Sequence, residues 1–190
     1  MFDATRSMIA ARIRRLMQGR MARRFVRRQD GAAAVEFALV AAPFLALTFA
    51  ILETAFVFFA SQTLEAATAD SARLIMTGQA QTAGFSASDF KTQVCARVYG
   101  LFDCANGITI NVQTYSSFSG INTASPIVNG QFDTTNMGYN PGNNPGDIVV
   151  VTLYYQWPVY VTMLGNNLAN LSGGKRLLAA TAVLRVEPYK

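Results

Sequence analysis

Two glutamates, Glu36 and Glu53, interrupt a long apolar stretch near the start of the sequence. The stretch runs over residues 32–60 and contains no other charged residue. An ionised carboxylate in hydrocarbon costs about 2.5 kcal/mol or more even on mild insertion scales, so glutamates in such segments are rare and usually functional. Glu36 and Glu53 are therefore the first candidates for a role in charge pairing.

The cysteines Cys95 and Cys104 are the next residues whose chemistry can be predicted. In an exported segment the environment is oxidising and favours a disulfide, worth about 2–3 kcal/mol for so short a loop. A metal site and a redox dithiol are the alternatives. The sequence contains no histidine, and the cysteine spacing is neither CxxC nor a zinc-ligand set. We expect a structural disulfide and no metal.

Catalytic chemistry has little support in the sequence. Without histidine the usual general base and metal ligand is absent. Neither a G-x-S-x-G motif nor a glycine-rich phosphate loop occurs. Acidic residues in the later part are scattered, such as Asp89, Asp103, Asp133 and Asp147. Carboxylate chemistry stays open, but we expect neither enzymatic activity nor a cofactor.

Aromatic residues gather in one late segment and have two interpretations. The residues are Tyr154, Tyr155, Trp157 and Tyr160. Such a group can stack against sugars, or it can belong to a strand that is buried against a helix. We favour the buried strand.

The elements that position these residues begin with a basic leader, residues 1–31. Nine arginines precede Asp30, against one acid, Asp3. Clustered arginines can bind nucleic acid, form a solvated arm, or flank a membrane helix on its cytoplasmic side, because such segments resist translocation. Since the apolar stretch follows directly, we favour the last. We expect a cytoplasmic N-terminus, the later residues outside, and no nucleic-acid partner.

Residues 32–60 are long enough to cross a bilayer once, since about 20 residues cross roughly 30 Å of hydrocarbon. Their length, Glu36 and Pro43 argue against a cleaved secretory signal. Pro43 should kink or loosen the helix. Small residues recur at every fourth position: Ala38, Ala42, Ala46 and Ala50. This spacing lets a second helix approach closely, although alanine is also simply common in membrane helices.

Helical periodicity continues beyond the apolar stretch, over residues 61–80. One set of residues recurs at helical spacing: Phe56, Phe59 or Ala60, Thr63 or Leu64, Ala67, Ser71 and Leu74. The charged residues Glu65, Asp70 and Arg73 fall on other faces. We therefore predict one long helix that continues as an amphipathic stem and ends near Gly78.

Gly31, followed by four small residues and then by Glu36 and Phe37, forms the pattern G-x-x-x-x-E-F after a basic leader. This pattern resembles the processing site of type IV prepilins, and specifically of the pseudopilins of Tad (tight adherence) pili. Residues 27–77 resemble the N-terminal segment of TadE-like proteins, including Glu53 in the phrase AILETAFVFF.

The resemblance implies that a prepilin peptidase cuts after Gly31 and leaves Ala32 as a new N-terminus near the hydrocarbon boundary. Glu36 then lies one helical turn away, within salt-bridge reach of an amine, and the resemblance implies that it meets the amine of a neighbouring subunit. Pairing offsets much of the desolvation that each charge suffers alone. Glycine lets the scissile peptide extend and a catalytic group approach. Otherwise Gly31 is a turn, and Glu36 extends toward the headgroups.

Residues 85–190 are expected to form the outer domain. A short helix comes first, capped by Ser88 and stopped by Gly100. Its apolar side consists of Phe90, Val94 and Val98.

Three later segments have the alternation or the β-branched and aromatic content typical of strands: residues 107–118, 147–161 and 176–189. In the first, one face of the strand is apolar: Ile108, Ile110 and Val112. Residues 119–146 are too long and polar for an ordinary hairpin loop, so they form an exposed interaction loop or, as we slightly favour, a tolerated insertion. A helical stem on a small antiparallel sheet is the pilin-like α+β fold.

Two hypotheses follow for function. In the first, the chain is a minor pseudopilin or assembly component of a Tad-type pilus in the bacterial inner membrane, with a prepilin peptidase, other Tad pilins, assembly-platform proteins and the lipid bilayer as partners. Its outer domain is then periplasmic or on the pilus. In the second, the chain is an uncleaved single-pass anchor whose periplasmic domain binds an envelope partner.

Overall fold

The computed structural model describes residues 31–98, 100–122, 124–161 and 167–189. The predicted basic leader, apart from Gly31, lies outside these residues. The chain comprises two compact units, Met1–Thr48 and Phe49–Lys190. One helix, α2, contributes residues to both of them.

Helix α2 (Ala32–Met76) is 45 residues long and contains Pro43. It ends where the sequence predicts, because Gly78 follows in the left-handed conformation, φ 75°, which glycine adopts without strain. A Cβ on Gly78 would lie 2.2 Å from the ring of Tyr189. Close packing against Tyr189 is therefore a second reason for glycine at this position.

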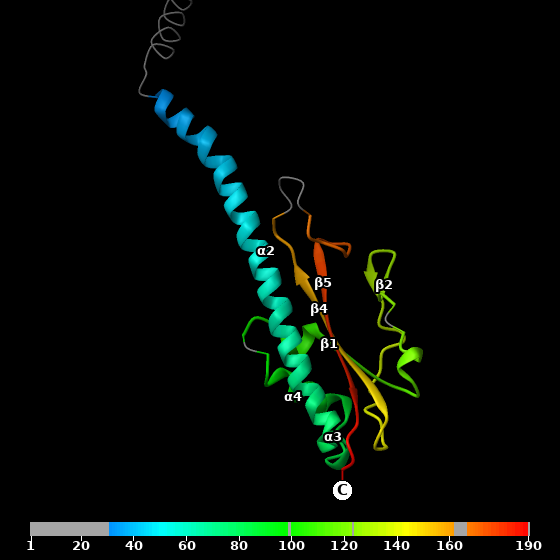
Figure 1. The fold of residues 1–190 in the computed structure, drawn as a ribbon. Coiled ribbons are helices and arrows are strands. Elements are labelled where there is room, and N and C mark those ends of the chain that lie inside the picture. The colour runs from blue at the N-terminus through cyan, green and yellow to red at the C-terminus, as the bar shows by residue number, and fades with distance from the viewer. Residues whose placement is uncertain (1–30, 99, 123, 162–166, 190) are drawn as a thin grey trace, which may run out of the picture. The chain divides into compact units, whose positions relative to one another are not determined.

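The second unit contains a three-stranded antiparallel sheet (Figure 1). Its strands, in spatial order, are β1 (Ile108–Tyr115), β4 (Ile148–Pro158) and β5 (Lys175–Arg185). In the register, Ile108 pairs with Tyr155, and Pro158 pairs with Lys175. The first two strands lie within the predicted segments, and the third begins one residue earlier. The prediction of antiparallel strands is confirmed.

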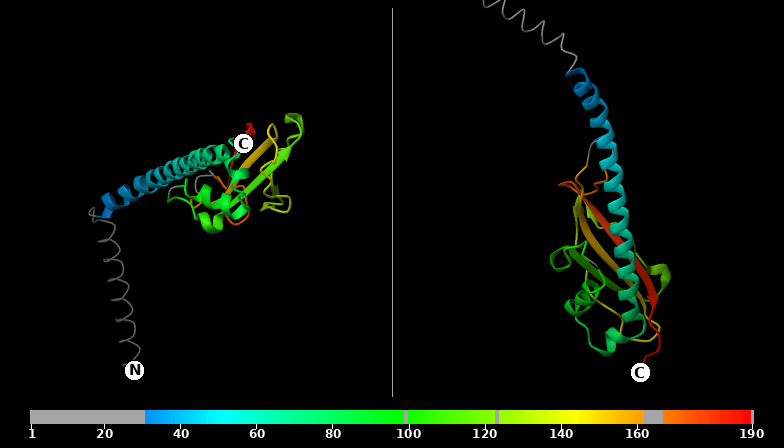
Figure 2. Two further views of the ribbon diagram at one scale, coloured as in Figure 1. Left: turned by 90° about the horizontal axis from the view of Figure 1, so that it is seen from below. Right: turned by 90° about the vertical axis from the view of Figure 1, so that its left-hand side faces the viewer.

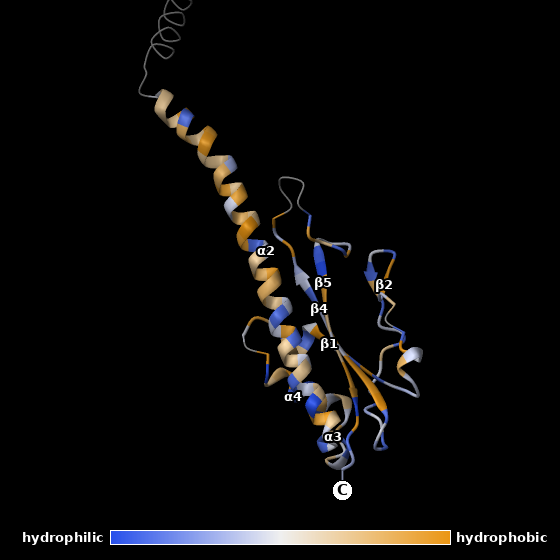
Figure 3. Cartoon of the chain, in the orientation of Figure 1, coloured by the Kyte–Doolittle hydropathy of each residue, from blue (hydrophilic) through white to orange (hydrophobic). Residues whose placement is uncertain are grey.

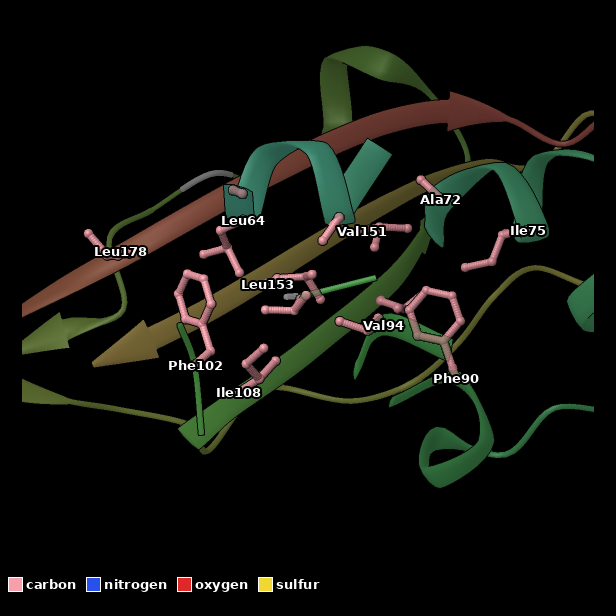
Figure 4. Close-up of a cluster of buried hydrophobic side chains, with 14 of the residues drawn as sticks. Leu64, Ala72, Ile75, Phe90, Val94, Phe102, Ile108, Val151, Leu153 and Leu178 are labelled. Carbon is pink, nitrogen blue, oxygen red and sulfur yellow. The ribbon is translucent and has the colours of Figure 1, made fainter. Parts of the chain in front are cut away.

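Within the second unit, α2 packs along one face of the sheet (Figure 2). The buried helix residues recur at helical spacing: Val57, Ala60, Leu64, Ala67, Thr68, Ser71, Ala72 and Ile75. Across from them lie alternate strand residues, including Ile108, Val151 and Leu153 (Figure 4). Full burial of a branched apolar side chain is worth about 1.5–3 kcal/mol, so this interface is the main core. The predicted pilin-like α+β fold is confirmed.

The predicted helix face is wrong at Phe56, and of the two alternatives Phe59 and Ala60 the second is correct. Phe56 and Phe59 are 55% and 59% exposed, whereas Val57 and Ala60 are buried. Helical spacing and hydrophobicity alone do not mark the face of an all-round apolar helix that packs against a domain. From Leu64 onward the predicted face is largely correct.

Three short helices connect the stem to the sheet: α3 (Gln79–Thr82), α4 (Ala87–Cys95) and α5 (Cys104–Gly107). The predicted cap of α4, Ser88, is wrong, because Ser86 is the N-cap. The Ser86 hydroxyl and Asp89 form a reciprocal capping box that needs an acceptor side chain three residues after the cap. These hydrogen bonds from Ser86 lower the pKa of Asp89. Helix α4 also ends five residues before Gly100.

A disulfide joins Cys95 and Cys104, whose Cα atoms are 5.6 Å apart. It connects the last residue of α4 to the first residue of α5. The same two helices are also linked by the Lys91 ammonium, which donates a hydrogen bond to the carbonyl of Ala105 (2.9 Å). The loop between α4 and α5 is therefore fixed at both ends.

The exported protein should resist alkylation at Cys95 and Cys104 until it is reduced. Cys95→Ser should lower the steady-state amount more than it alters processing, because loss of this cross-link destabilises the fold by about 2–3 kcal/mol. Mass spectrometry after alkylation, with and without reductant, and immunoblotting measure the two effects. Full alkylation without reductant would contradict the prediction.

The opposite face of the sheet carries a smaller core, in which Tyr154 is buried. Partly buried residues from the polar segment 119–146 cover it: Ile127, Phe132 and Met137. The first two belong to a hairpin of β2 (Ile127–Val128) and β3 (Gln131–Phe132). Part of this long segment therefore packs against the sheet.

The interpretation of the aromatic residues as a strand buried against the stem holds only in part. Tyr155 and Trp157 pack with Phe102 in the core beneath α2. Tyr154 is buried on the opposite face of the sheet. Tyr160 lies beyond the end of β4 and is 83% exposed, so the interpretation is wrong for this residue.

Tyr139 packs on Phe90, with ring centroids 5.4 Å apart, and its buried hydroxyl has no hydrogen-bond partner within the described residues. Burial, with a smaller effect of the Asp89 charge, raises the pKa of Tyr139 to about 12. A phenol with a raised folded-state pKa contributes stability that is present below about pH 10 and is lost as the pH rises to about 12.

Tyr139→Phe should therefore remove part of the alkaline loss of stability. Chemical denaturation at a series of pH values should give similar free energies of unfolding for the variant and the parent below about pH 10. Above that pH the variant should be the more stable. Parallel curves up to pH 12 would contradict the assignment.

Candidate membrane and assembly site

The beginning of α2 carries apolar side chains on all sides. Its most apolar window of 18 residues has a mean hydropathy of 2.2, and none of the window is buried. In Figure 3 most of the ribbon at the beginning of α2 has the colours of hydrophobic residues. Large exposed apolar residues in the first unit are Val35, Phe37, Leu39, Val40, Phe44, Leu45 and Leu47. The helix is therefore long and apolar enough to cross a bilayer once.

Gly31 immediately precedes α2 and is exposed. Its φ angle lies outside the left-handed region that favours glycine, and a Cβ placed on it would meet no atom within 4 Å. The fold of the described residues therefore does not require glycine here. A requirement for glycine at this position must come from something that binds the chain.

Glu36 lies in the second turn of α2, and both Glu36 and Phe37 are exposed. Ala32 is four residues earlier, on the same side of the helix. The next basic residue along the chain is Arg73, far beyond the reach of Glu36 on the same helix. The basic residue within α2 therefore cannot pair with Glu36 of the same helix.

The four alanines predicted for helix packing all lie on α2. Ala38 and Ala42 are exposed, whereas Ala46 and Ala50 are half-buried. Residues four apart lie on nearly the same side of a helix, so the alanines form a narrow row of small side chains. Their role in helix packing stays a prediction.

Among the described residues, Glu53 is the one charged side chain that is buried. It is 8% exposed, and its carboxylate accepts hydrogen bonds from two successive backbone amides. The amide of Tyr160 donates to Oε1 (2.5 Å) and the amide of Val161 donates to Oε2 (2.6 Å). Hydrogen bonds of this kind to an ionised acceptor are roughly twice as strong as neutral ones. They connect α2 to the segment that follows β4.

Sequence analysis identified Glu53 as a candidate but missed its partners. The donors lie 107 and 108 residues further along the chain. They are main-chain groups, which every residue except proline carries. The one available signal was the isolated carboxylate itself, since a buried charge must find partners.

Glu53→Ala should lower the thermal unfolding temperature of the full-length protein in detergent. Its loss leaves two partly buried amides without an acceptor, at a cost of about 1–3 kcal/mol each. Glu53→Gln keeps one acceptor oxygen and should lose less. Glu65→Ala removes an exposed glutamate from the same helix and is the matched control. If Glu53→Ala and Glu65→Ala unfold at the same temperature, the two amide contacts contribute nothing to stability.

These features define a class of protein: a pilin-like α+β chain whose long N-terminal helix is apolar and exposed at its beginning and packs on an antiparallel sheet at its end. Residues 31–73 match the family model described as TadE-like protein, so the chain carries a TadE-like domain in this region. The match begins at Gly31 and includes Glu36 and Glu53. Neither a curated protein nor a solved structure matches the chain.

Proposed function

We propose that this chain is a minor pseudopilin or assembly component of a Tad-type pilus, processed after Gly31 by a prepilin peptidase. The observation that carries the proposal is the coincidence at Gly31. The TadE-like match begins at this residue, and the fold itself gives no reason for glycine there. A peptidase that binds the chain in extended form supplies the reason.

The orientation of α2 in the membrane follows from the positive charge of the residues that precede it. Nine arginines precede residue 30, and the next basic residue after Arg28 is Arg73. Short segments rich in Lys and Arg stay in the cytoplasm. The N-terminus is therefore cytoplasmic, residues 32–60 cross the inner membrane once, and the stem (residues 61–80) and the outer domain (residues 85–190) lie in the periplasm or on the pilus.

In this proposal, α2 makes the contacts that assemble the chain with other subunits of the pilus. After cleavage, Ala32 carries an ammonium that pairs with Glu36 of a neighbouring subunit, which neutralises both charges near the hydrocarbon boundary. Phe37 and the row of small residues from Ala38 to Ala50 then contact other helices of the pilus or of its assembly platform. Exposure of Phe37, Ala38 and Ala42 in the single chain is consistent with that role.

Intact mass of the protein purified from its membrane tests the proposal. A chain that begins at Ala32 supports processing after Gly31. A chain that retains the leader favours the alternative, an uncleaved membrane-anchored protein whose periplasmic domain binds an envelope partner. Deletion of the prepilin peptidase is the control, because it should convert the shorter form into the longer one.

A further inference from the structure

Tyr160 combines high exposure with a fixed backbone. Its side chain is 83% exposed, yet its amide is bound to Glu53, and the preceding residue, Val159, is buried and donates a hydrogen bond to the carbonyl of Gly174 (2.9 Å). The backbone thus holds the tyrosine beside α2, at the level of Glu53. A tyrosine has an apolar ring and a polar hydroxyl, which suits it to the boundary between hydrocarbon and water.

Cations lie at the same end of the sheet. Lys175 pairs in register with Pro158, and Arg176 pairs with Trp157. Lys175 is exposed, and the Arg176 guanidinium donates to the carbonyl of Leu168. No acidic residue occurs in the sequence between Asp147 and Glu187, and the Glu53 carboxylate, which lies at the same level, is buried and bound by two amides. We call Tyr160, Lys175 and Arg176 the basic rim; its charge complements an anionic surface.

The position of the basic rim along α2 matches the outer boundary of a bilayer. About 20 residues of helix cross roughly 30 Å of hydrocarbon, and Ala32–Leu52 is a segment of about this length. With Ala32 at the inner boundary, a helix that crosses without much tilt reaches the outer boundary at about Glu53. Just beyond Glu53, α2 still carries exposed apolar side chains. Three phenylalanines are each more than half exposed: Phe56, Phe58 and Phe59.

We propose that the basic rim binds the anionic phospholipid headgroups of the outer leaflet, so that the sheet domain rests on the membrane its own helix crosses. Tyr160 inserts at the headgroup level, and Lys175 and Arg176 contact lipid phosphates. The Glu53 carboxylate, bound by two amides, holds the rim at this depth. This inference rests on the proposed single membrane crossing.

Depth-resolved fluorescence tests the insertion of Tyr160. Trp157 is the one tryptophan of the chain, so Trp157→Phe provides a background for single-tryptophan reporters in the full-length protein. With Tyr160→Trp in this background, reconstituted into vesicles that contain brominated phospholipids, bromines near the headgroup should quench the emission more than bromines deep in the acyl chains. Phe118→Trp is the matched control, an exposed aromatic residue beyond the other end of β1, and it should show little quenching.

Vesicle charge tests the role of the cations. Partial replacement of phosphatidylcholine by phosphatidylglycerol should increase quenching of the Tyr160→Trp reporter. In anionic vesicles, Lys175→Gln should lower the ratio of lipid-bound to unbound basic rim about fivefold, as expected for the loss of one cation near an anionic surface. This ratio is obtained from the quenching of the Tyr160→Trp reporter. Arg185→Gln, at the opposite end of β5, should leave it unchanged. Equal quenching in both kinds of vesicle, insensitive to Lys175→Gln, would overturn the assignment to anionic lipid.

A third reporter separates this inference from the proposed membrane crossing. Phe44→Trp, on the exposed apolar part of α2, should be quenched by deep bromines. If this reporter is quenched but Tyr160→Trp is not, α2 crosses the membrane and the basic rim does not bind it. Emission of Tyr160→Trp that depends on protein density and not on bromine would assign the rim to a second copy of the chain, and would overturn lipid binding. If neither reporter is quenched, the membrane crossing itself is wrong.

Discussion

A Gly31→Leu variant should accumulate almost entirely as the full-length chain. The leucine side chain obstructs the peptidase at the scissile bond, whereas the fold tolerates it, because a Cβ at Gly31 meets no atom within 4 Å. Membrane insertion should not change, since the arginines that set orientation remain. Intact mass measures processing, and a reporter fused after Lys190 that is active only outside the cytoplasm measures topology.

Gly31→Ala is the graded control for this experiment. Its single methyl group should slow cleavage less than the leucine side chain does. A Gly31→Leu protein with the same mass as the parent would show that Gly31 is only a turn before the helix. The prepilin interpretation of G-x-x-x-x-E-F would then be replaced by that of the uncleaved anchor.

Loss of Glu36 should abolish most pilus assembly while leaving the protein in the membrane. Glu36→Ala makes α2 more apolar, so insertion and cleavage should proceed. The new ammonium at Ala32, however, loses its partner near hydrocarbon, where an unpaired charge costs several kcal/mol. Counting pili by electron microscopy, beside immunoblots of the processed chain, measures the effect.

Glu36→Gln distinguishes charge from shape, because glutamine keeps the length of the side chain but cannot neutralise an amine. It should resemble Glu36→Ala. Glu65→Ala, an exposed glutamate further along the same helix, should assemble normally. Normal piliation of both Glu36 variants would exclude charge pairing as the role of Glu36.

Elements that depend on local pattern could be predicted from the sequence. Alternation of Ile108, Ile110 and Val112 marked one face of β1, because successive side chains in a strand point to opposite faces. Gly78 marked the end of α2, since its left-handed backbone favours glycine. In both cases the structural cause lies within a few residues of the signal.

Features that depend on tertiary contact could not be predicted in the same way. Phe56 looked like a core residue and is exposed, because its hydrophobicity does not distinguish lipid or a second protein from its own sheet. Glu53 was recognised as unusual, but its amide donors lie more than 100 residues away in the sequence.

The N-cap of α4, by contrast, could have been predicted from the sequence. A capping box needs an acceptor side chain three residues after the cap, and Asp89 follows Ser86 by three residues, whereas Lys91 follows Ser88.

If the proposed topology holds, the contact between Glu53 and the amides of Tyr160 and Val161 also implies an order of events during export. With the N-terminus in the cytoplasm, residues after the membrane helix emerge in sequence order, so Glu53 is exposed first and these donors only after about 100 further residues have followed. Until then the carboxylate depends on water or headgroups, while the cysteine pair, nine residues apart, can already close. In the proposed topology, Glu53 therefore gains its two amide donors only when the residues that follow β4 have been exported. In the proposed topology, a chain that ends before Tyr160 has an inserted helix whose Glu53 lacks both amide donors.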